Sequence, residues 1–169
     1  MGADKAFVTV DGVAMVIRVA TTLRRAGATS VRTIGGDLTQ LRELGLDAEP
    51  DPRQGDGPLG GLVTALEAAT EAIAAVLATD LAWLRPEVVQ ALVDRLGLDP
   101  AADVAAAHGG RREPLCAVWR IDPCLDELRD AHLAGERAVH RAMERLSVAE
   151  VTVDPATVRN ANHPEDLHQ

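Results

Sequence analysis

The chain has 169 residues, of which 47% are apolar and 25% charged, and this length and balance predict one soluble globular domain with a sizeable core. Seventeen basic residues against 26 acidic ones give a net charge of -9, which together with the scarcity of aromatic residues argues against nucleic-acid binding. No signal peptide or membrane-spanning run is recognisable, and two cysteines without metal or redox spacing suggest reduced thiols in the cytoplasm.

The first third of the chain alternates strand and helix patterns. The expected elements are a strand or hairpin arm at 7–10, a helix at 13–26, a strand at 29–34, a helix at 38–44 and a strand at 46–49. Asp11-Gly12 is a turn signal, Gly27 closes the first helix, and Asp37 is a plausible N-cap of the second. This β-α-β alternation favours a parallel sheet.

The stretch from Asp51 to Asp80 carries the strongest chemical signal. A loop rich in Pro, Gly and Asp leads into a helix after Gly57, and an unbroken apolar run follows at 72–78. A strand without polar alternation is expected in the middle of a parallel sheet, covered on both faces. Ligands of such sheets bind beyond the carboxyl ends of the strands, which is where Asp80 lies.

Two features of this stretch have both a functional and a structural interpretation. A carboxylate at the end of a buried strand suits Mg²⁺, but Asp80 equally fits an N-cap or a turn. The glycines of GPLGG at 57–61 would let a phosphate approach the N–H groups of a helix start. They equally fit a turn and helix start with no ligand, because no Lys-Ser/Thr follows as in a P-loop. These residues alone leave both questions open.

The second half of the chain continues the alternation. The expected elements are a helix at 86–97, strands at 103–107 and 115–119, helices at 122–134 and 136–146, a strand at 148–153, and a loop with a terminal turn at 160–167. His132, Glu136 and His140 have the spacing of one helix face, but Gly135 interrupts it and HExxH is not matched. We therefore interpret these three as surface residues.

Four motifs together resemble those of the molybdenum cofactor guanylyltransferases, which are MobA-like nucleotidyltransferases. They are DKA at 4–6, GPLGGL at 57–62, TD at 79–80 and RNANHPEDL at 159–167, and the resemblance covers nearly the whole chain. It implies a single domain over 1–169 with a Rossmann-like three-layer α/β fold and a mostly parallel sheet. It also implies Mg²⁺-dependent transfer of GMP from GTP to the phosphate of molybdopterin or molybdenum cofactor, with cofactor-maturation proteins as further partners.

The same resemblance implies roles for particular residues. Lys5 and Asp80 would be catalytic, with Asp80 as the metal ligand and Lys5 balancing the charge of the triphosphate. The implied nucleotide-binding residues are Lys5, Asp51, Gly57, Pro58, Leu59, Gly60 and Asp80. The implied acceptor-binding residues are Arg112, Pro114, Arg137, Asn160 and Asn162.

Each role has a structural alternative. Asp51 could simply open a turn, Lys5 could be an exposed solubility residue, and the arginines could be solvated surface residues rather than ligands of the pterin phosphate. The asparagines could cap a terminal helix.

The sequence departs from the family pattern in places. Residue 82 is Ala where the family usually has Pro, and residue 163 is His where it has Thr. In the family, a strand and the loop LAGGxSxR precede the Met-Gly with which this sequence begins, so the first strand and the main triphosphate cradle would be missing. We expect a misplaced start or a fragment, the alternative being a shortened paralogue; in-frame upstream codons for the segment would favour the former.

Other functions stay open. A sister transferase would use CTP, or another phosphorylated acceptor such as a sugar or lactyl phosphate, although GPLGGL argues for guanine. A catalytically dead paralogue would instead bind a partner in cofactor maturation.

Overall fold

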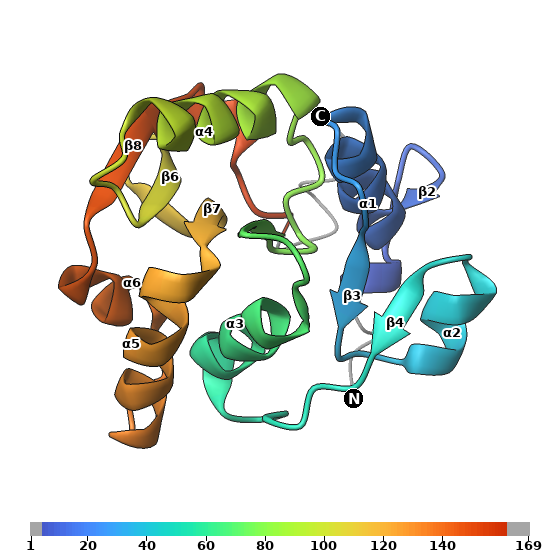
Figure 1. The fold of residues 1–169 in the computed structure, drawn as a ribbon. Helices are drawn as coiled ribbons and strands as arrows, with labels where there is room; N and C mark the ends of the chain where they lie inside the picture. Colours follow the sequence, from blue (N-terminus) through green and yellow to red (C-terminus); the bar gives the residue numbers. More distant parts are fainter. Residues whose placement is uncertain (1–4, 162–169) are drawn as a thin grey trace.

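A computed structural model describes residues 5–161, in which four strands form a central sheet between two layers of helices (Figure 1). The strands stand in the order β5-β7-β6-β8, with bounds β5 (Ile73–Leu77), β6 (Val104–His108), β7 (Arg112–Arg120) and β8 (Val148–Thr152). β6 is parallel to β8, whereas β7 is antiparallel to both β5 and β6. The sheet is therefore mixed.

Alternate residues of the central strands face opposite helical layers, as the two-residue period of a strand requires. Val104 and Ala106 pack toward one layer, made of α3 (Gly57–Ala68), α5 (Ile121–Leu133) and α6 (Val139–Ala142). Ala105 and Ala107 pack toward the other, which contains α4 (Pro86–Leu98) and α1 (Met15–Arg25). This confirms the three-layer α/β architecture predicted from the sequence.

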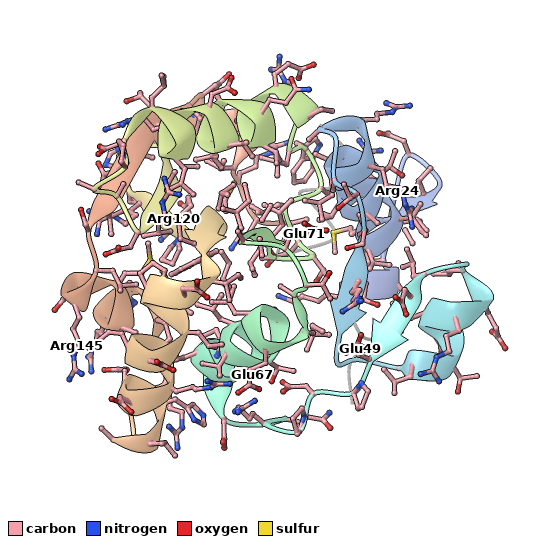
Figure 2. All side chains as sticks on the ribbon, in the orientation of Figure 1. Arg24, Glu49, Glu67, Glu71, Arg120 and Arg145 are labelled. Carbon is pink, nitrogen blue, oxygen red and sulfur yellow. The ribbon has the colours of Figure 1, made fainter. Side chains whose placement is uncertain are left out.

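Arg120, labelled in Figure 2, ties the end of β7 to its surroundings. Its Nε donates to the carbonyl of Ala102 at 3.0 Å and its Nη2 to the carbonyl of Leu96 at 2.8 Å. The second bond satisfies a carbonyl in the last turn of α4, which has no partner within the helix. The two hydrogen bonds thereby fix the position of α4 relative to the end of β7.

The N-terminal third forms smaller units beside this sheet. They are η1 (Lys5–Phe7), β1 (Thr9–Val10), β2 (Val13–Ala14), β3 (Arg32–Ile34), α2 (Leu38–Glu43) and β4 (Asp47–Glu49). β1 and β2 form the hairpin expected at Asp11-Gly12, where both residues have positive φ, 52° and 76°. Asp37 is the N-cap of α2, because its Oδ1 accepts from the N–H groups of Thr39 and Gln40 at 3.0 Å.

The mostly parallel arrangement predicted from the sequence is wrong for the central sheet. β6 and β7 are joined only by residues 109–111, and so short a connection forms a hairpin whose strands must be antiparallel. The parallel pair β3 and β4, connected through α2, forms a separate two-stranded sheet.

β5 was expected in the middle of the sheet, and this prediction is also wrong. Within residues 5–161, β5 pairs only with β7, and its other side borders a groove of about 390 Å³ toward β3. The groove is largely apolar, with Leu23, Val89 and Val93 among its lining residues. An unbroken apolar run indicates apolar surroundings, but it does not tell which of them are strands.

The expected helix at 136–146 is shorter than predicted. The structure has α6 followed by η2 (Met143–Arg145), and η3 (Pro155–Thr157) comes after β8. Glu136 explains the late start, because its Oε1 accepts from the N–H groups of Arg137 and Ala138 at 2.8 Å and so holds the chain in a turn. Most of the turn expected at 160–167 lies outside the described residues. No helix within 5–161 combines the length and apolar character needed to cross a membrane.

Candidate functional site

A pocket of about 390 Å³ lies at the carboxyl end of β5, and we call it the Asp80 pocket. It is lined by Pro58 from the first turn of α3, Asp80 after β5, Pro114 from β7 and Asn160 after η3. All four were predicted site residues, and they come from segments far apart in the sequence. The remaining lining residues are Ala78, Leu81, Glu113, Leu115, Ala138, Val139 and His140.

Two backbone hydrogen bonds explain how Asp80 and Asn160 meet. The N–H of Ala78 donates to the carbonyl of Leu115 at 2.8 Å, which is the last link between β5 and the start of β7. Asp80 follows directly, and its own carbonyl accepts from the N–H of Ala161 at 2.9 Å. Asn160 is thereby brought against the end of β5.

One oxygen of the Asp80 carboxylate lacks a hydrogen-bond partner among the described residues. This atom, Oδ1, is buried, and a buried polar atom without a partner is uncommon. Burial raises the pKa of Asp80 above its ordinary value of 3.8, and the charge of Glu113 raises it further, while a backbone hydrogen bond and the charge of Lys5 act in the opposite direction. A buried, unpartnered carboxylate oxygen is a suitable ligand for a hard cation.

The oxygen donors around the pocket fit Mg²⁺ rather than a metal that needs an all-protein cage. Asp80, Glu113 and Asn160 all line it, whereas residues 5–161 contain no group of three or more His, Cys, Asp or Glu side chains placed to hold a metal. Mg²⁺ is usually held by one or two carboxylates and completes its shell with water and substrate phosphates.

Lys5 lies in η1 and is the only lysine in the sequence. Its side chain is close enough to Asp80 for its charge to lower the pKa of that carboxyl. The charge of one predicted catalytic residue, Lys5, therefore acts on the other, Asp80. Lys5 also supplies a positive charge beside a pocket whose lining residues include two carboxylates and neither arginine nor lysine.

Two glycines at the start of α3, Gly57 and Gly60, are closely packed against neighbouring residues. Gly57 has a φ of +74°, and a Cβ there would lie 3.1 Å from the Cβ of Arg137. The N–H of Leu59 donates to the carbonyl of Arg137 at 3.1 Å, so one N–H group of this helix start is already paired, and the Leu59 side chain is fully buried. Phosphate binding at this turn stays a prediction. Of the two residues, Pro58 lines the pocket and Leu59 does not.

Two helical glycines give a matched test of this packing. A Cβ at Gly60 would lie 3.0 Å from the Cβ of Arg53, whereas a Cβ at Gly97 in α4 would meet nothing within 4 Å. We expect Gly60→Ala to lower the free energy of unfolding by about 1–3 kcal/mol through overpacking, and Gly97→Ala to raise it by up to about 1 kcal/mol through helix propensity. Urea unfolding of both variants measures this, and equal effects would show that the Gly60 contact is easily relieved.

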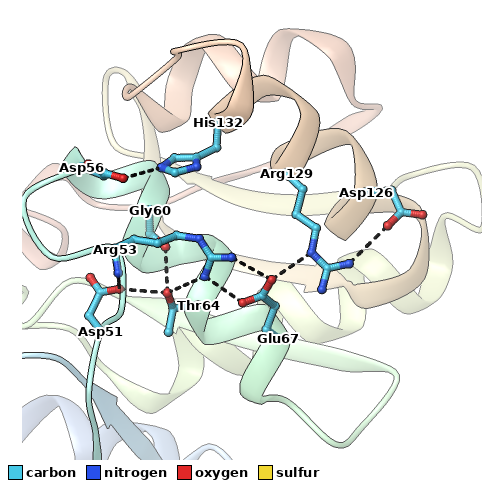
Figure 3. A network of polar contacts seen from close by, with 9 residues as sticks. All are labelled: Asp51, Arg53, Asp56, Gly60, Thr64, Glu67, Asp126, Arg129 and His132. Atoms are coloured by element: carbon cyan, nitrogen blue, oxygen red, sulfur yellow. Dashed lines mark hydrogen bonds and ion pairs between the residues drawn. The ribbon is translucent and has the colours of Figure 1, made fainter.

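Asp51 belongs to a polar network that ties the loop before α3 to α3 and α5 (Figure 3). Its Oδ1 accepts from the N–H of Arg53 and from the hydroxyl of Thr64, both at 2.9 Å. The Arg53 guanidinium donates to Glu67 at 2.8 and 3.0 Å, and Arg129 of α5 donates to the same carboxylate at 2.9 Å. Both arginines lower the pKa of Glu67, and the hydrogen bond from Arg53 has the largest effect.

Asp51 thus serves the turn that the Asp-Pro pair suggested. It does not line the Asp80 pocket, and its part in nucleotide binding stays a prediction.

The predicted acceptor-binding arginines are not among the residues that line the pocket. Arg112 pairs with Glu150 of β8 at 2.7 Å. Arg137 donates from Nη1 to the carbonyls of His132 and Glu136 at 2.9 and 2.8 Å. Contacts of these arginines with the acceptor stay predictions, and Asn162 lies outside the described residues.

Two titratable residues that line the pocket, Glu113 and His140, were not proposed from the sequence as site residues. Glu113 lies at the start of β7, beside the end of β5. Predicting its place in the pocket would have required the register of the β6–β7 hairpin. His140 is exposed, as predicted, but it also lines the pocket. The prediction that His132 is a surface residue is wrong, because its side chain is only 11% exposed and lies 3.3 Å from Asp56.

Comparison with known proteins places this geometry in context. Residues 1–151 match the family model described as the MobA-like NTP transferase domain. The chain is 36% identical over 120 residues to a probable molybdenum cofactor guanylyltransferase of Pelotomaculum thermopropionicum, a match that covers 70% of this chain and 57% of that protein. It is 31% identical over 171 residues to a molybdenum cofactor guanylyltransferase of Rhodobacter capsulatus, covering 99% and 86% of the two chains.

Solved structures share the fold of this chain. A molybdopterin-guanine dinucleotide biosynthesis protein A from Archaeoglobus fulgidus is 25% identical with a TM-score of 0.76, covering 98% of this chain and 88% of that one. A 2-C-methyl-D-erythritol 4-phosphate cytidylyltransferase from Thermus thermophilus, at 17% identity, shares the fold with a TM-score of 0.73 over 96% of this chain and 90% of that one.

Proposed function

Since this chain belongs to the MobA-like NTP transferase family, we propose that it transfers GMP from GTP to the phosphate of molybdopterin or molybdenum cofactor. The observation that carries the proposal is the Asp80 pocket, where a buried carboxylate oxygen with no hydrogen-bond partner among the described residues shares one cavity with Pro58 and Asn160. The relatives named as guanylyltransferases favour GTP and molybdopterin as the substrates. The product would be the guanine dinucleotide cofactor, made in the cytoplasm, and proteins of cofactor maturation would be further partners of the chain.

We propose Mg²⁺ as the metal, with Asp80 as its protein ligand and Asn160 and Glu113 as the neighbouring oxygen donors. When bound, Mg²⁺ supplies positive charge that stabilises the negative charge developing on the phosphates during transfer. Within residues 5–161, the cation whose charge acts on Asp80 is Lys5.

The reaction needs positioning more than a protein nucleophile. A phosphate oxygen of the acceptor forms the new bond to the α-phosphorus of GTP, and the bond from that phosphorus to the bridging oxygen breaks to release pyrophosphate. Lys5 would neutralise charge on the triphosphate, and Asn160 would orient a substrate oxygen through its amide.

The two cysteines do not offer an alternative covalent route. Cys116 and Cys124 are both buried, and burial raises the pKa of each thiol to about 12. They are therefore protonated at neutral pH, which makes them poor nucleophiles.

Pyrophosphate release tests the proposal. The chain incubated with Mg²⁺, molybdopterin and GTP should release pyrophosphate, and replacing GTP with CTP or ATP should reduce the rate. Release with CTP but not GTP would assign the chain to a cytidylyltransferase with the same fold. A folded chain that releases none with any of the three nucleotides would contradict the enzymatic proposal.

A further inference from the structure

Trp83 and Arg159 form a contact between two segments of the candidate site. Trp83 follows Asp80 by three positions, and Arg159 directly precedes Asn160. The Cζ atom of Arg159 lies 4.0 Å from the centroid of the Trp83 ring, which is the geometry of a cation–π stack. The contact therefore joins the segment that follows Asp80 to the segment that precedes Asn160.

A backbone hydrogen bond holds the other side of Asn160. The N–H of Ala161 donates to the carbonyl of Asp80 at 2.9 Å. Ala161 is buried in a small apolar cluster with Val10, Met15 and Ala82, and Trp83 packs against the same cluster. Asn160 is thus flanked on one side by a stacked guanidinium and on the other by a buried, hydrogen-bonded alanine.

The segment that carries Trp83 is itself anchored to α1. Arg18 donates from Nε to the carbonyl of Ala82 at 2.9 Å, and the Thr22 hydroxyl donates to the carbonyl of Leu84 at 3.1 Å. The carbonyls on both sides of Trp83 are therefore fixed by a helix. The ring is a firm support against which the segment of Asn160 is placed.

Arg159 depends on this ring for its position. Its Nε is buried and has no hydrogen-bond partner within residues 5–161. The observed contact of the guanidinium is the face of Trp83. Removing the ring should therefore release the arginine and loosen the segment that follows it.

We propose that the Trp83–Arg159 stack positions Asn160 beside Asp80, so that the side chains of Asn160 and Asp80 can bind one divalent cation. Both stack members are positioning residues, because neither is among the residues that line the pocket. The inference rests on the proposed function for the role of the cation, but the stack and its effect on Ala161 can be measured without any activity.

Hydrogen exchange at the Ala161 amide tests the positioning directly. We expect this amide to exchange about 3- to 30-fold faster in Trp83→Leu than in the unmodified chain, as follows from the usual strength of a cation–π contact. The amide of Leu44 at the end of α2, which donates to the carbonyl of Gln40, should keep its rate, because a local opening of that short helix leaves the stack intact. Trp83→Phe retains a ring face and should restore most of the protection at Ala161.

Arg159→Met provides a second route if Trp83→Leu destabilises the whole fold, and Arg159→Lys is its charge-conserving control. Arg159→Met should speed exchange at Ala161 and leave the rate of the Leu44 amide in α2 unchanged. Unchanged exchange at Ala161 in a folded Trp83→Leu or Arg159→Met variant would overturn the positioning role.

A functional measurement separates this inference from the proposed activity. In pyrophosphate release, Trp83→Leu should raise the Mg²⁺ concentration needed for half-maximal rate, and Trp83→Phe should reverse the change. If the unmodified chain releases no pyrophosphate, the proposed activity fails while the exchange result still decides the role of the stack. An active Trp83→Leu variant with an unchanged Mg²⁺ requirement would contradict the link between the stack and the cation.

Discussion

Asp80→Asn is expected to lower kcat/KM for pyrophosphate release by about a thousandfold, the loss typical of removing one centrally placed electrostatic group. Asparagine keeps the size of the side chain but removes the charge that would hold Mg²⁺. Steady-state kinetics with GTP and molybdopterin measure the effect. The matched control is Asp94→Asn, an exposed aspartate of α4 that does not line the pocket, which should leave kcat/KM unchanged.

The same substitution should make the metal-free protein more stable at neutral pH. Burial raises the pKa of Asp80 in the folded protein, so the folded state holds this proton more tightly than the unfolded state. The contribution to stability is therefore complete below the ordinary pKa of 3.8 and is lost as the pH rises through the raised folded pKa. At pH 7 the ionised Asp80 opposes folding, and Asn at this position does not.

Thermal unfolding in chelator checks this sign. The Tm of Asp80→Asn should exceed that of the unmodified chain at pH 7, and the difference should shrink as the pH is lowered toward 4. A lower Tm at pH 7 would show that the carboxylate has a stabilising partner and is not held in reserve for a cation. Higher stability together with lost activity is the combination expected of a site that stores an unpaired charge.

Lys5→Met should lower kcat by about a hundredfold, because it removes a positive charge placed beside the pocket. It should also move the acid limb of the pH–rate profile to higher pH. The charge of Lys5 lowers the pKa of Asp80, and without it that carboxyl would keep its proton to a higher pH. Lys5→Arg keeps the charge and should retain both the position of the acid limb and most of kcat.

The composition of the chain offers a direct measurement at this residue. Lys5 is the only lysine, so an amine-reactive reagent modifies it and otherwise only the terminal amine. GTP with Mg²⁺ should slow the modification of Lys5 if this side chain contacts the triphosphate. Modification at the same rate with and without nucleotide, together with wild-type kinetics of Lys5→Met, would return Lys5 to the class of exposed solubility residues.

Features that depend on neighbouring residues were predictable from the sequence. The Asp11-Gly12 hairpin, the N-cap at Asp37 and the helix after Gly57 each follow from local backbone preferences, and the structure confirms all three. Asp80 was proposed as a site residue for the same reason, since it directly follows an apolar strand, and it lines a pocket in the structure. The motifs around it identified the family, and the family model that matches residues 1–151 confirms the identification.

Features that depend on which segments pair were decided by the tertiary structure. The position of β5 at the edge of the described sheet, the antiparallel β7 and the presence of Glu113 in the pocket all follow from strand register, which short patterns do not encode. The pairing of Arg112 with Glu150 likewise joins two strands that are distant in sequence. Local chemistry thus indicated the residues that we propose to bind phosphate and metal, whereas long-range pairing determined which of them share one pocket, because a side chain's neighbours depend on the whole packed chain.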